Sequence, residues 1–163
     1  MPDTCQPREC DEGEFAQLSA INPSDIRIAA MDYLARREHS LKELKQKLKK
    51  RFNDDELIGQ QLERLVEENL QSDTRFAESF VRQRFNRGLG PLRIRQEMRQ
   101  RGIGDVDIQR AMEAENFDWY GSARAVLSRK YGDVPAQDLK QKAKRSRFMQ
   151  YRGFSPEHFK NIV

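Results

Sequence analysis

From residue 26 to the C-terminus, apolar side chains recur three and four residues apart, which is the spacing of one face of an α-helix. The first such face carries Ile26, Ala30, Tyr33 and Leu34, and eight further segments continue the pattern. No stretch of five or more residues alternates apolar and polar positions as a β-strand would. We therefore predict an all-α fold. The other residues predicted to face inward are Leu41, Leu44, Leu48, Phe52, Leu57, Leu62, Leu65, Val66, Phe76, Phe80, Val81, Phe85, Ile94, Met98, Ile108, Met112, Trp119, Ala123, Val126, Leu127 and Tyr131.

Residues with helix-capping or helix-breaking chemistry separate these segments. Ser24 or Asp25 can cap a first helix that begins near Ile26, because their side-chain oxygens accept hydrogen bonds from free backbone N–H groups. Ser40, with Glu43 three residues later, matches a capping box. The other helices are predicted to begin or end at Asn53–Asp55, Ser72–Asp73, Pro91, Gly102, Asp118, Ala136, Gly153 and Ser155–Pro156.

The nine predicted helices fall into three repeats. Phe52, Ile103 and Phe154 are 51 residues apart at each step, and each lies between the second and third helix of its repeat. Residues 101–112 also align without gaps to residues 152–163, whereas the first repeat lacks the glycine that precedes Ile103 and Phe154. A chance match between common helix-turn-helix spacings is the alternative. Repeats of this length indicate stacked units in an elongated chain. The predicted units are 26–70, 72–116 and 118–163.

Composition divides the chain into an acidic leader and a basic body. Residues 1–25 carry a net charge of −5, so residues 26–163 carry +9 of the overall +4. The leader is polar and contains three prolines, and we predict that it is disordered. A basic body indicates an anionic partner such as nucleic acid or an acidic protein surface. Charged faces that only keep a helical protein in solution are the alternative. Because only 37% of residues are hydrophobic, we expect several small cores.

Candidate catalytic chemistry is sparse. Cys5 and Cys10 are the two cysteines of the chain, and without further ligands nearby they predict neither a disulfide framework nor a metal site. The turn at Gly88–Pro91 lacks the third glycine and the preceding strand of a dinucleotide-binding motif. No apolar run approaches the roughly 20 residues of a membrane span, and no signal peptide is evident. We therefore predict a cytoplasmic binding protein that is not an enzyme and has no cofactor.

Basic residues gather largely on the second helix of each predicted repeat. Residues 42–51 are rich in lysine, residues 75–101 hold eight arginines and no lysine, and residues 140–152 hold six basic residues and no acid. Arginine suits bidentate contacts with carboxylate or phosphate. If the repeats stack in register, the second helices form one long basic stripe; three separate solvated faces are the alternative. The residues predicted to bind a partner are Arg84, Arg87, Arg93, Arg95, Arg99, Arg101, Lys140, Lys144, Arg145, Arg147 and Arg152.

Three aromatic residues have two interpretations. Trp119, Tyr120 and Tyr131 can stack on nucleic-acid bases. Their helical spacing also fits a place in the core, which is the interpretation that we favour.

Several short segments together resemble the RecX regulatory proteins, which are bacterial modulators of the RecA recombinase. In order, these segments are SLKELKQKL (40–48), DTRFAESF (73–80), GPLRIRQEM (90–98), GI (102–103), RKYG (129–132) and RFMQYRGF (147–154). The resemblance spans about residues 26–163 and leaves out the leader. It implies tandem three-helix repeats in a curved, elongated molecule that binds within the groove of RecA–DNA filaments. It also implies lowered ATPase, strand-exchange and coprotease activities of RecA, and we expect a monomer.

A direct DNA-binding protein of the helix-turn-helix type is the rival interpretation. In such a protein the third helix of one repeat would enter the major groove. The third helices argue mildly against this, because segments such as 107–115 hold several acids and few basic residues.

Overall fold

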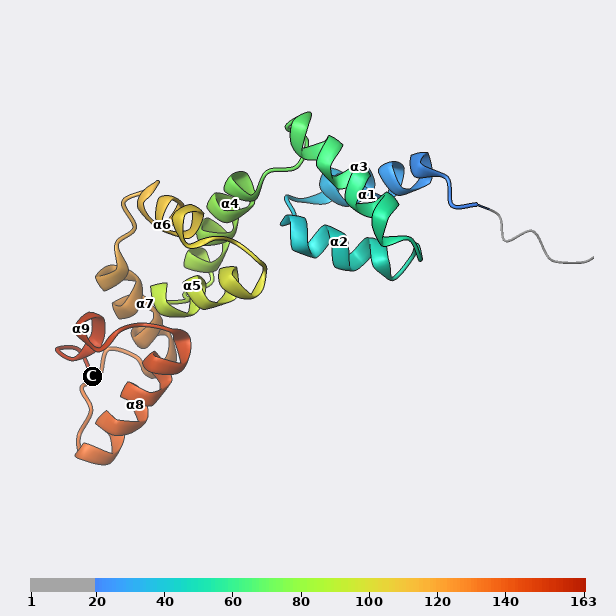
Figure 1. The fold of residues 1–163 in the computed structure, drawn as a ribbon. Helices are drawn as coiled ribbons and strands as arrows, with labels where there is room; N and C mark the ends of the chain where they lie inside the picture. Colours follow the sequence, from blue (N-terminus) through green and yellow to red (C-terminus); the bar gives the residue numbers. More distant parts are fainter. Residues whose placement is uncertain (1–19) are drawn as a thin grey trace, which may run out of the picture.

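The computed structural model describes residues 20–163, and these residues form nine α-helices and no β-strand (Figure 1). The helices follow one another in three groups of three, as the repeat predicts. Unit 1 contains α1 (Pro23–Arg36), α2 (Leu41–Lys49) and α3 (Asp55–Glu67). Unit 2 contains α4 (Asp73–Asn86), α5 (Pro91–Gln100) and α6 (Asp105–Glu113). Unit 3 contains α7 (Trp119–Tyr131), α8 (Leu139–Arg152) and α9 (Pro156–Phe159).

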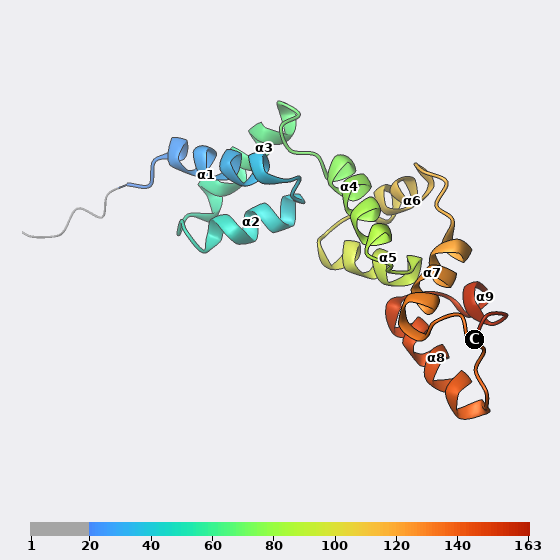
Figure 2. The same ribbon diagram turned by 180° about the vertical axis from the view of Figure 1, so that it is seen from behind.

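The three units lie one after another along an arc, so the molecule is elongated and curved (Figures 1 and 2). In both views α2, α5 and α8 lie along the inner edge of the arc. The predicted fold class is therefore confirmed, and the second helix of each unit faces the same side.

Each unit has its own small hydrophobic core. Leu44 and Leu48 of α2 are fully buried in unit 1, Ile94 and Met98 of α5 in unit 2, and Met149 of α8 in unit 3. The second helix of each unit thus presents one face to its own core. The opposite face carries mostly polar and charged side chains that are exposed.

The predicted inward faces are largely correct, and α3 contains the main error. Val66 is 45% exposed, whereas Ile58 and Gln61 are buried beside Leu62 and Leu65. The buried face follows the spacing 58, 61, 62 and 65, so Val66 lies at its border.

The first helix begins earlier than its apolar pattern predicts. Asn22 is the cap, because its side-chain oxygen accepts a 3.0 Å hydrogen bond from the backbone N–H of Ser24. Pro23 then occupies the first turn, where its missing N–H costs nothing. Ser24 and Asp25, the predicted caps, lie inside the helix. The residues that precede Ala20, including Cys5 and Cys10, lie outside the described part of the chain, as does most of the predicted acidic leader.

The 51-residue register has a clear structural basis in units 2 and 3. Gly102 and Gly153 have positive φ angles of 80° and 93°. The backbone N–H of the residue after each glycine donates a hydrogen bond to the carbonyl five residues earlier. These bonds run from Ile103 to Met98 and from Phe154 to Met149, both at 3.1 Å. Glycine adopts this left-handed conformation without a steric cost.

Unit 1 ends its second helix in another way. The equivalent position is Arg51, which does not take a positive φ, and the Phe52 N–H bonds instead to the carbonyl of Leu48 at 2.8 Å. The weaker match of the first repeat in sequence thus reflects a different turn.

Candidate partner-binding surface

The second helices of units 2 and 3 meet end to end. The N–H of Gly90 donates to the carbonyl of Arg152 at 2.8 Å, and the N–H of Leu92 donates to that of Gly153 at 3.0 Å. The first N–H groups and last carbonyls of a helix have no partner within the helix, so each end here satisfies the other. A Cβ atom at Gly90 would lie 2.3 Å from the backbone of Gly153. The two glycines therefore allow α8 to abut α5.

The second helices of units 1 and 2 meet in a similar way, but through side chains. Ser40 Oγ, at the start of α2, donates to the carbonyl of Arg101 at 2.8 Å. Lys42 Nζ donates to the carbonyl of Gln100 at 3.0 Å. The C-terminal end of α5 is thereby capped by the N-terminal end of α2. We call the resulting line of three helices the α8–α5–α2 row; it follows the inner edge of the arc in Figure 1.

Helix α8 is the part of the row with the most uncompensated positive charge. Lys140, Lys144 and Arg147 are exposed, and none forms an ion pair with a carboxylate within residues 20–163. They lie at positions i, i+4 and i+7, so they share one helical face. No acidic residue occurs within α8. This face therefore attracts anions, because none of its three cations is paired with a carboxylate among the described residues.

The arginines around α5 are in a different situation, because Glu97 of α5 lies close to Arg84 of α4, Arg93 of α5 and Arg101 at the end of α5. The Glu97 carboxylate lies 2.9 Å from Arg84 and 3.0 Å from Arg93, and 4.0 Å from Arg101. Its side chain is only 16% exposed. The hydrogen bond from Arg93 to Glu97 raises the pKa of the Arg93 guanidinium. These three arginines are thus engaged inside the molecule.

The same network reaches units 1 and 3. Arg101 Nε lies 3.2 Å from a carboxylate oxygen of Glu43 in α2, and Arg93 Nη1 donates to the carbonyl of Tyr151 in α8 at 3.3 Å. Burial raises the pKa of Glu43, but the hydrogen bond and charge of Arg37 outweigh burial and leave that pKa below its usual value. The network thus joins unit 2 to unit 1 through an ion pair and to unit 3 through a hydrogen bond.

Comparison with known protein families identifies the family that has this architecture. The models of the first, second and third three-helix domains of RecX match residues 27–65, 72–112 and 118–163. The chain belongs to the RecX family. The chain is 47% identical to Regulatory protein RecX of Ectopseudomonas mendocina over 82% of its own length and 89% of the relative's. It is 46% identical to Regulatory protein RecX of Pseudomonas entomophila over 86% and 92%.

Solved RecX structures share the fold. A crystal structure of RecX from Lactobacillus salivarius has a TM-score of 0.69 at 22% identity and covers 86% of this chain and 93% of its own. A second crystal structure of regulatory protein RecX has a TM-score of 0.68 at 28% identity, covering 86% and 72%. The resemblance noted from short segments is confirmed, and a RecX regulatory role follows from it.

The other arginines predicted to bind a partner in this RecX chain differ in whether they already contact a side chain within the chain. Arg99 pairs with Asp105 at 3.0 Å, and Arg95 donates to the side-chain amide of Gln109 at 3.0 Å. Arg87, just after α4, is exposed and has no ion pair within the described residues. Of these three, Arg87 is the most available to a partner.

Two basic residues of α8 contribute to the interior of unit 3. Arg145 is 8% exposed, donates to the carbonyl of Val134 at 2.9 Å and lies over the ring of Tyr131 at 5.0 Å. Arg152 is half-buried, with its guanidinium 5.8 Å from the ring centroid of Phe148. A long basic side chain can bury its stem and place its charged end on a carbonyl. We leave Arg145 out of the candidate surface for this reason.

The second basic cluster is not confined to the second helix of its unit. Arg75, Arg82 and Arg84 belong to α4, where Arg75 pairs with Glu38 at 3.1 Å and Arg82 pairs with Glu115 at 2.5 Å. Only α2 and α8 carry their clusters as the sequence pattern predicts, so the row is most basic at its two ends.

The aromatic residues divide between core and surface. Trp119 packs against Phe85 and Phe117, and Tyr131 packs against Phe148. For these two, the core interpretation is correct, whereas Tyr120 is 57% exposed. Tyr151 is a further exposed aromatic residue, which the sequence pattern did not bring into the predicted surface. It lies 11 residues after Lys140 and so continues the helical face of Lys140, Lys144 and Arg147. That spacing alone would have revealed it.

The described residues also bear on other kinds of site. In residues 20–163, no three His, Cys, Asp or Glu side chains gather in a way that could hold a metal ion. No helix in that range is both long enough and apolar enough to cross a membrane.

Proposed function

We propose that this chain binds RecA–DNA filaments through the α8–α5–α2 row and thereby inhibits the recombinase, ATPase and coprotease activities of RecA. In this proposal it acts in the cytoplasm, as a monomer, during recombinational DNA repair and the SOS response. Membership of the RecX family and the resemblance to RecA modulators support the choice of partner. The position of the positive charge supports the choice of face.

The observation that carries the proposal is the charged face of α8, a helix that lies on the inner edge of the arc. Lys140, Lys144 and Arg147 are exposed and free of carboxylates among the described residues. A RecA–DNA filament offers phosphates and acidic side chains, and both bind such a face. The three helices of the row, joined end to end along the inner edge, can contact a filament over a long distance, so several weak contacts act together.

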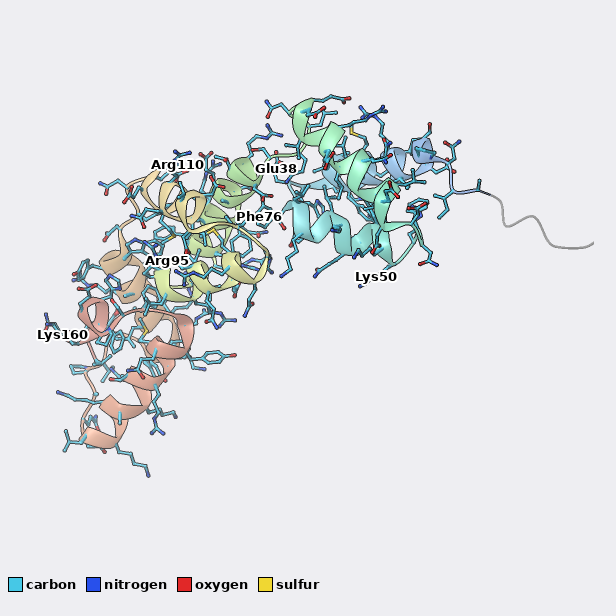
Figure 3. All side chains as sticks on the ribbon, in the orientation of Figure 1. Glu38, Lys50, Phe76, Arg95, Arg110 and Lys160 are labelled. Atoms are coloured by element: carbon cyan, nitrogen blue, oxygen red, sulfur yellow. The ribbon has the colours of Figure 1, made fainter. Side chains whose placement is uncertain are left out.

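A charge-reversal experiment tests this proposal. The variant K140E/K144E/R147E should need at least about tenfold more protein to inhibit the RecA ATPase on single-stranded DNA, because three attractions become repulsions. The matched control is R110E/K160E, since Arg110 and Lys160 are exposed and lie on the outer edge of the arc (Figure 3). The control should inhibit within about twofold of the unmodified chain. Unchanged inhibition by the α8 variant would remove this face from the proposal.

The structure gives no support to the helix-turn-helix rival in unit 2. Helix α6 carries Asp105, Asp107 and Glu113 against a single arginine, Arg110. Such a helix would repel the phosphates that line the major groove. A salt titration separates the two interpretations, because the row should bind DNA without sequence preference and lose affinity steeply with salt.

A further inference from the structure

The C-terminal end of α8 presents an aromatic ring to the solvent. Tyr151 is 74% exposed. The guanidinium carbon of Arg93 lies 5.2 Å from the centre of the Tyr151 ring, while Nη1 of Arg93 is held by the Tyr151 carbonyl. The arginine covers one face of the ring and fixes its position, and the exposure of the residue leaves the other face open. A fixed ring with one open face is a stacking platform.

A hollow of about 400 Å³ lies beside this ring, between α5 and α8. Leu92, which is 56% exposed, supplies an apolar wall. Gln96, Gln100 and Gln150 also line the hollow, and the side-chain amide of each offers both donors and an acceptor. The carboxylate of Glu97, a further lining residue, is paired with Arg93. An apolar wall, an aromatic face and amide groups together match a nucleobase, which has flat faces and polar edges.

The approach to the hollow is basic. Lys144 and Arg147 precede Tyr151 by seven and four residues, so they lie on the same face of α8 in the two turns before the ring. Lys140 continues the face by one more turn. A polynucleotide strand that follows this face would place its phosphates on the cations and bring a base to the ring.

We propose that the α5–α8 hollow binds an unpaired base of single-stranded DNA, stacked on the open face of Tyr151, while Lys144 and Arg147 hold the adjoining phosphates. A base within a duplex has both faces covered by its neighbours, so the site selects single strands over duplex. The inference rests on the proposed function in one respect, since the filament is the source of the strand. An acidic protein segment would use the cations but would leave the ring and the amides without a partner.

The test uses the full chain, without recombinase, and compares a fluorescein-labelled oligo(dT) with a labelled duplex. Tyr151→Ala should weaken oligo(dT) binding about tenfold and leave duplex binding and the salt dependence unchanged. Tyr151→Phe keeps the ring and should bind oligo(dT) within about twofold of the unmodified chain. Tyr120→Ala removes another exposed tyrosine from unit 3 and should have no effect. Circular dichroism of each variant verifies the fold.

Three results would overturn the inference: unchanged oligo(dT) binding by Tyr151→Ala, equal losses for single strand and duplex, or no binding of oligo(dT) by the unmodified chain. Loss of poly-glutamate binding on Tyr151→Ala, with oligo(dT) binding intact, would assign the hollow to an acidic peptide instead. Measurement of RecA ATPase inhibition on the same samples separates the two proposals. Inhibition without oligo(dT) binding removes only the base site, whereas Tyr151-dependent oligo(dT) binding without inhibition removes only the proposed function.

Discussion

The two junctions of the α8–α5–α2 row join equivalent helix ends by different chemistry. Between units 2 and 3, the backbone N–H groups of Gly90 and Leu92 bond directly to backbone carbonyls at the end of α8. Between units 1 and 2, the donors are the side chains of Ser40 and Lys42. The ion pair between Glu43 and Arg101 supports that second junction, at 3.2 Å.

The difference predicts what each junction can tolerate. The backbone junction between two glycines leaves no room for a Cβ atom, and its two main hydrogen bonds join uncharged backbone groups, with Arg93 as the one charged group that bonds across it among the described residues. The side-chain junction contains the charged groups Lys42, Glu43 and Arg101, and a buried histidine, His39, lies beside it. Salt and pH should therefore act more strongly on the junction of units 1 and 2, whereas an added Cβ atom at Gly90 or Gly153 should act on that of units 2 and 3.

The largest effect is expected at Gly153. Its φ of 93° disfavours any residue with a Cβ atom, and that atom would lie 2.2 Å from the Cβ of Arg93. Gly153→Ala should lower the free energy of unfolding by about 3 kcal/mol. Urea denaturation followed by the fluorescence of Trp119, the single tryptophan, reports on this part of the chain. In Gly59→Ala, a helical site with open space around it, stability should rise by about 0.5–1 kcal/mol.

The next largest effect is expected at Glu97, which links the two junctions. Glu97→Gln leaves Arg84, Arg93 and Arg101 without their shared carboxylate and should cost about 2 kcal/mol. Hydrogen exchange should become faster at both junctions, because Arg93 and Arg101 reach units 3 and 1. Glu63→Gln, at an exposed site of α3, is the control and should change stability by less than about 0.5 kcal/mol. Exchange that rises at one junction alone would show that Glu97 does not couple them.

A pair of serine substitutions isolates the contact between units 1 and 2. Ser40 and Ser72 both cap a helix, but only Ser40 also donates across a junction, to Arg101. Ser72→Ala should cost about 1 kcal/mol, the usual value of a cap. Ser40→Ala should cost about 2 kcal/mol, because it also removes the hydrogen bond to the Arg101 carbonyl in a part-buried site. Equal losses in urea denaturation would mean that the bond between units adds nothing.

The smallest effect is a pH dependence confined to the junction of units 1 and 2. Burial lowers the pKa of His39, and the charges of Arg37 and Lys47 lower it further, against the hydrogen bond to the Arg37 carbonyl and the charge of Glu43. The folded chain thus favours neutral His39. Its contribution is complete above about pH 6.5, the ordinary histidine pKa, and declines as the pH falls below that value.

Hydrogen exchange between about pH 7 and pH 5 measures this effect, after correction for the intrinsic exchange rate. The Leu41 amide, which bonds to Asp73 at this junction, should lose protection at the lower pH. The Leu92 amide at the other junction should not. His39→Gln should remove the difference between the two pH values, and an unchanged pH response in that variant would assign it to another group.

Helix positions and the repeat could be predicted from the sequence because they depend on local spacing. The capping box of Ser40 and Glu43 involves residues three apart, and it is present as predicted. The turns at Gly102 and Gly153 likewise depend on glycine at one position. Such features are encoded within a few residues, so a single sequence reveals them.

The candidate surface was less predictable because it depends on contacts between distant residues. Arg101 meets Glu43 across 58 positions, so its neutralisation has no local signal. Arg145 lies in a run without acids, which indicates exposure, yet its guanidinium finds a backbone carbonyl inside unit 3. Conversely, Tyr151 was overlooked although its spacing from Lys140 and Lys144 places it on the α8 face. Charge patterns identified α8 as the most basic helix of the row but not which of its charges are free of contacts within the chain.

A lysine footprint tests most directly whether the α8–α5–α2 row is the binding face. The chain would be acetylated briefly with and without RecA filaments on single-stranded DNA, and each lysine quantified by mass spectrometry. Lys50 lies beyond α2 on the inner edge and Lys160 lies on the outer edge (Figure 3). If the row is the binding face, filaments should protect Lys50, Lys140 and Lys144 and leave Lys160 as reactive as in the free chain. Protection of Lys160 with unchanged reactivity of Lys140 and Lys144 would contradict it.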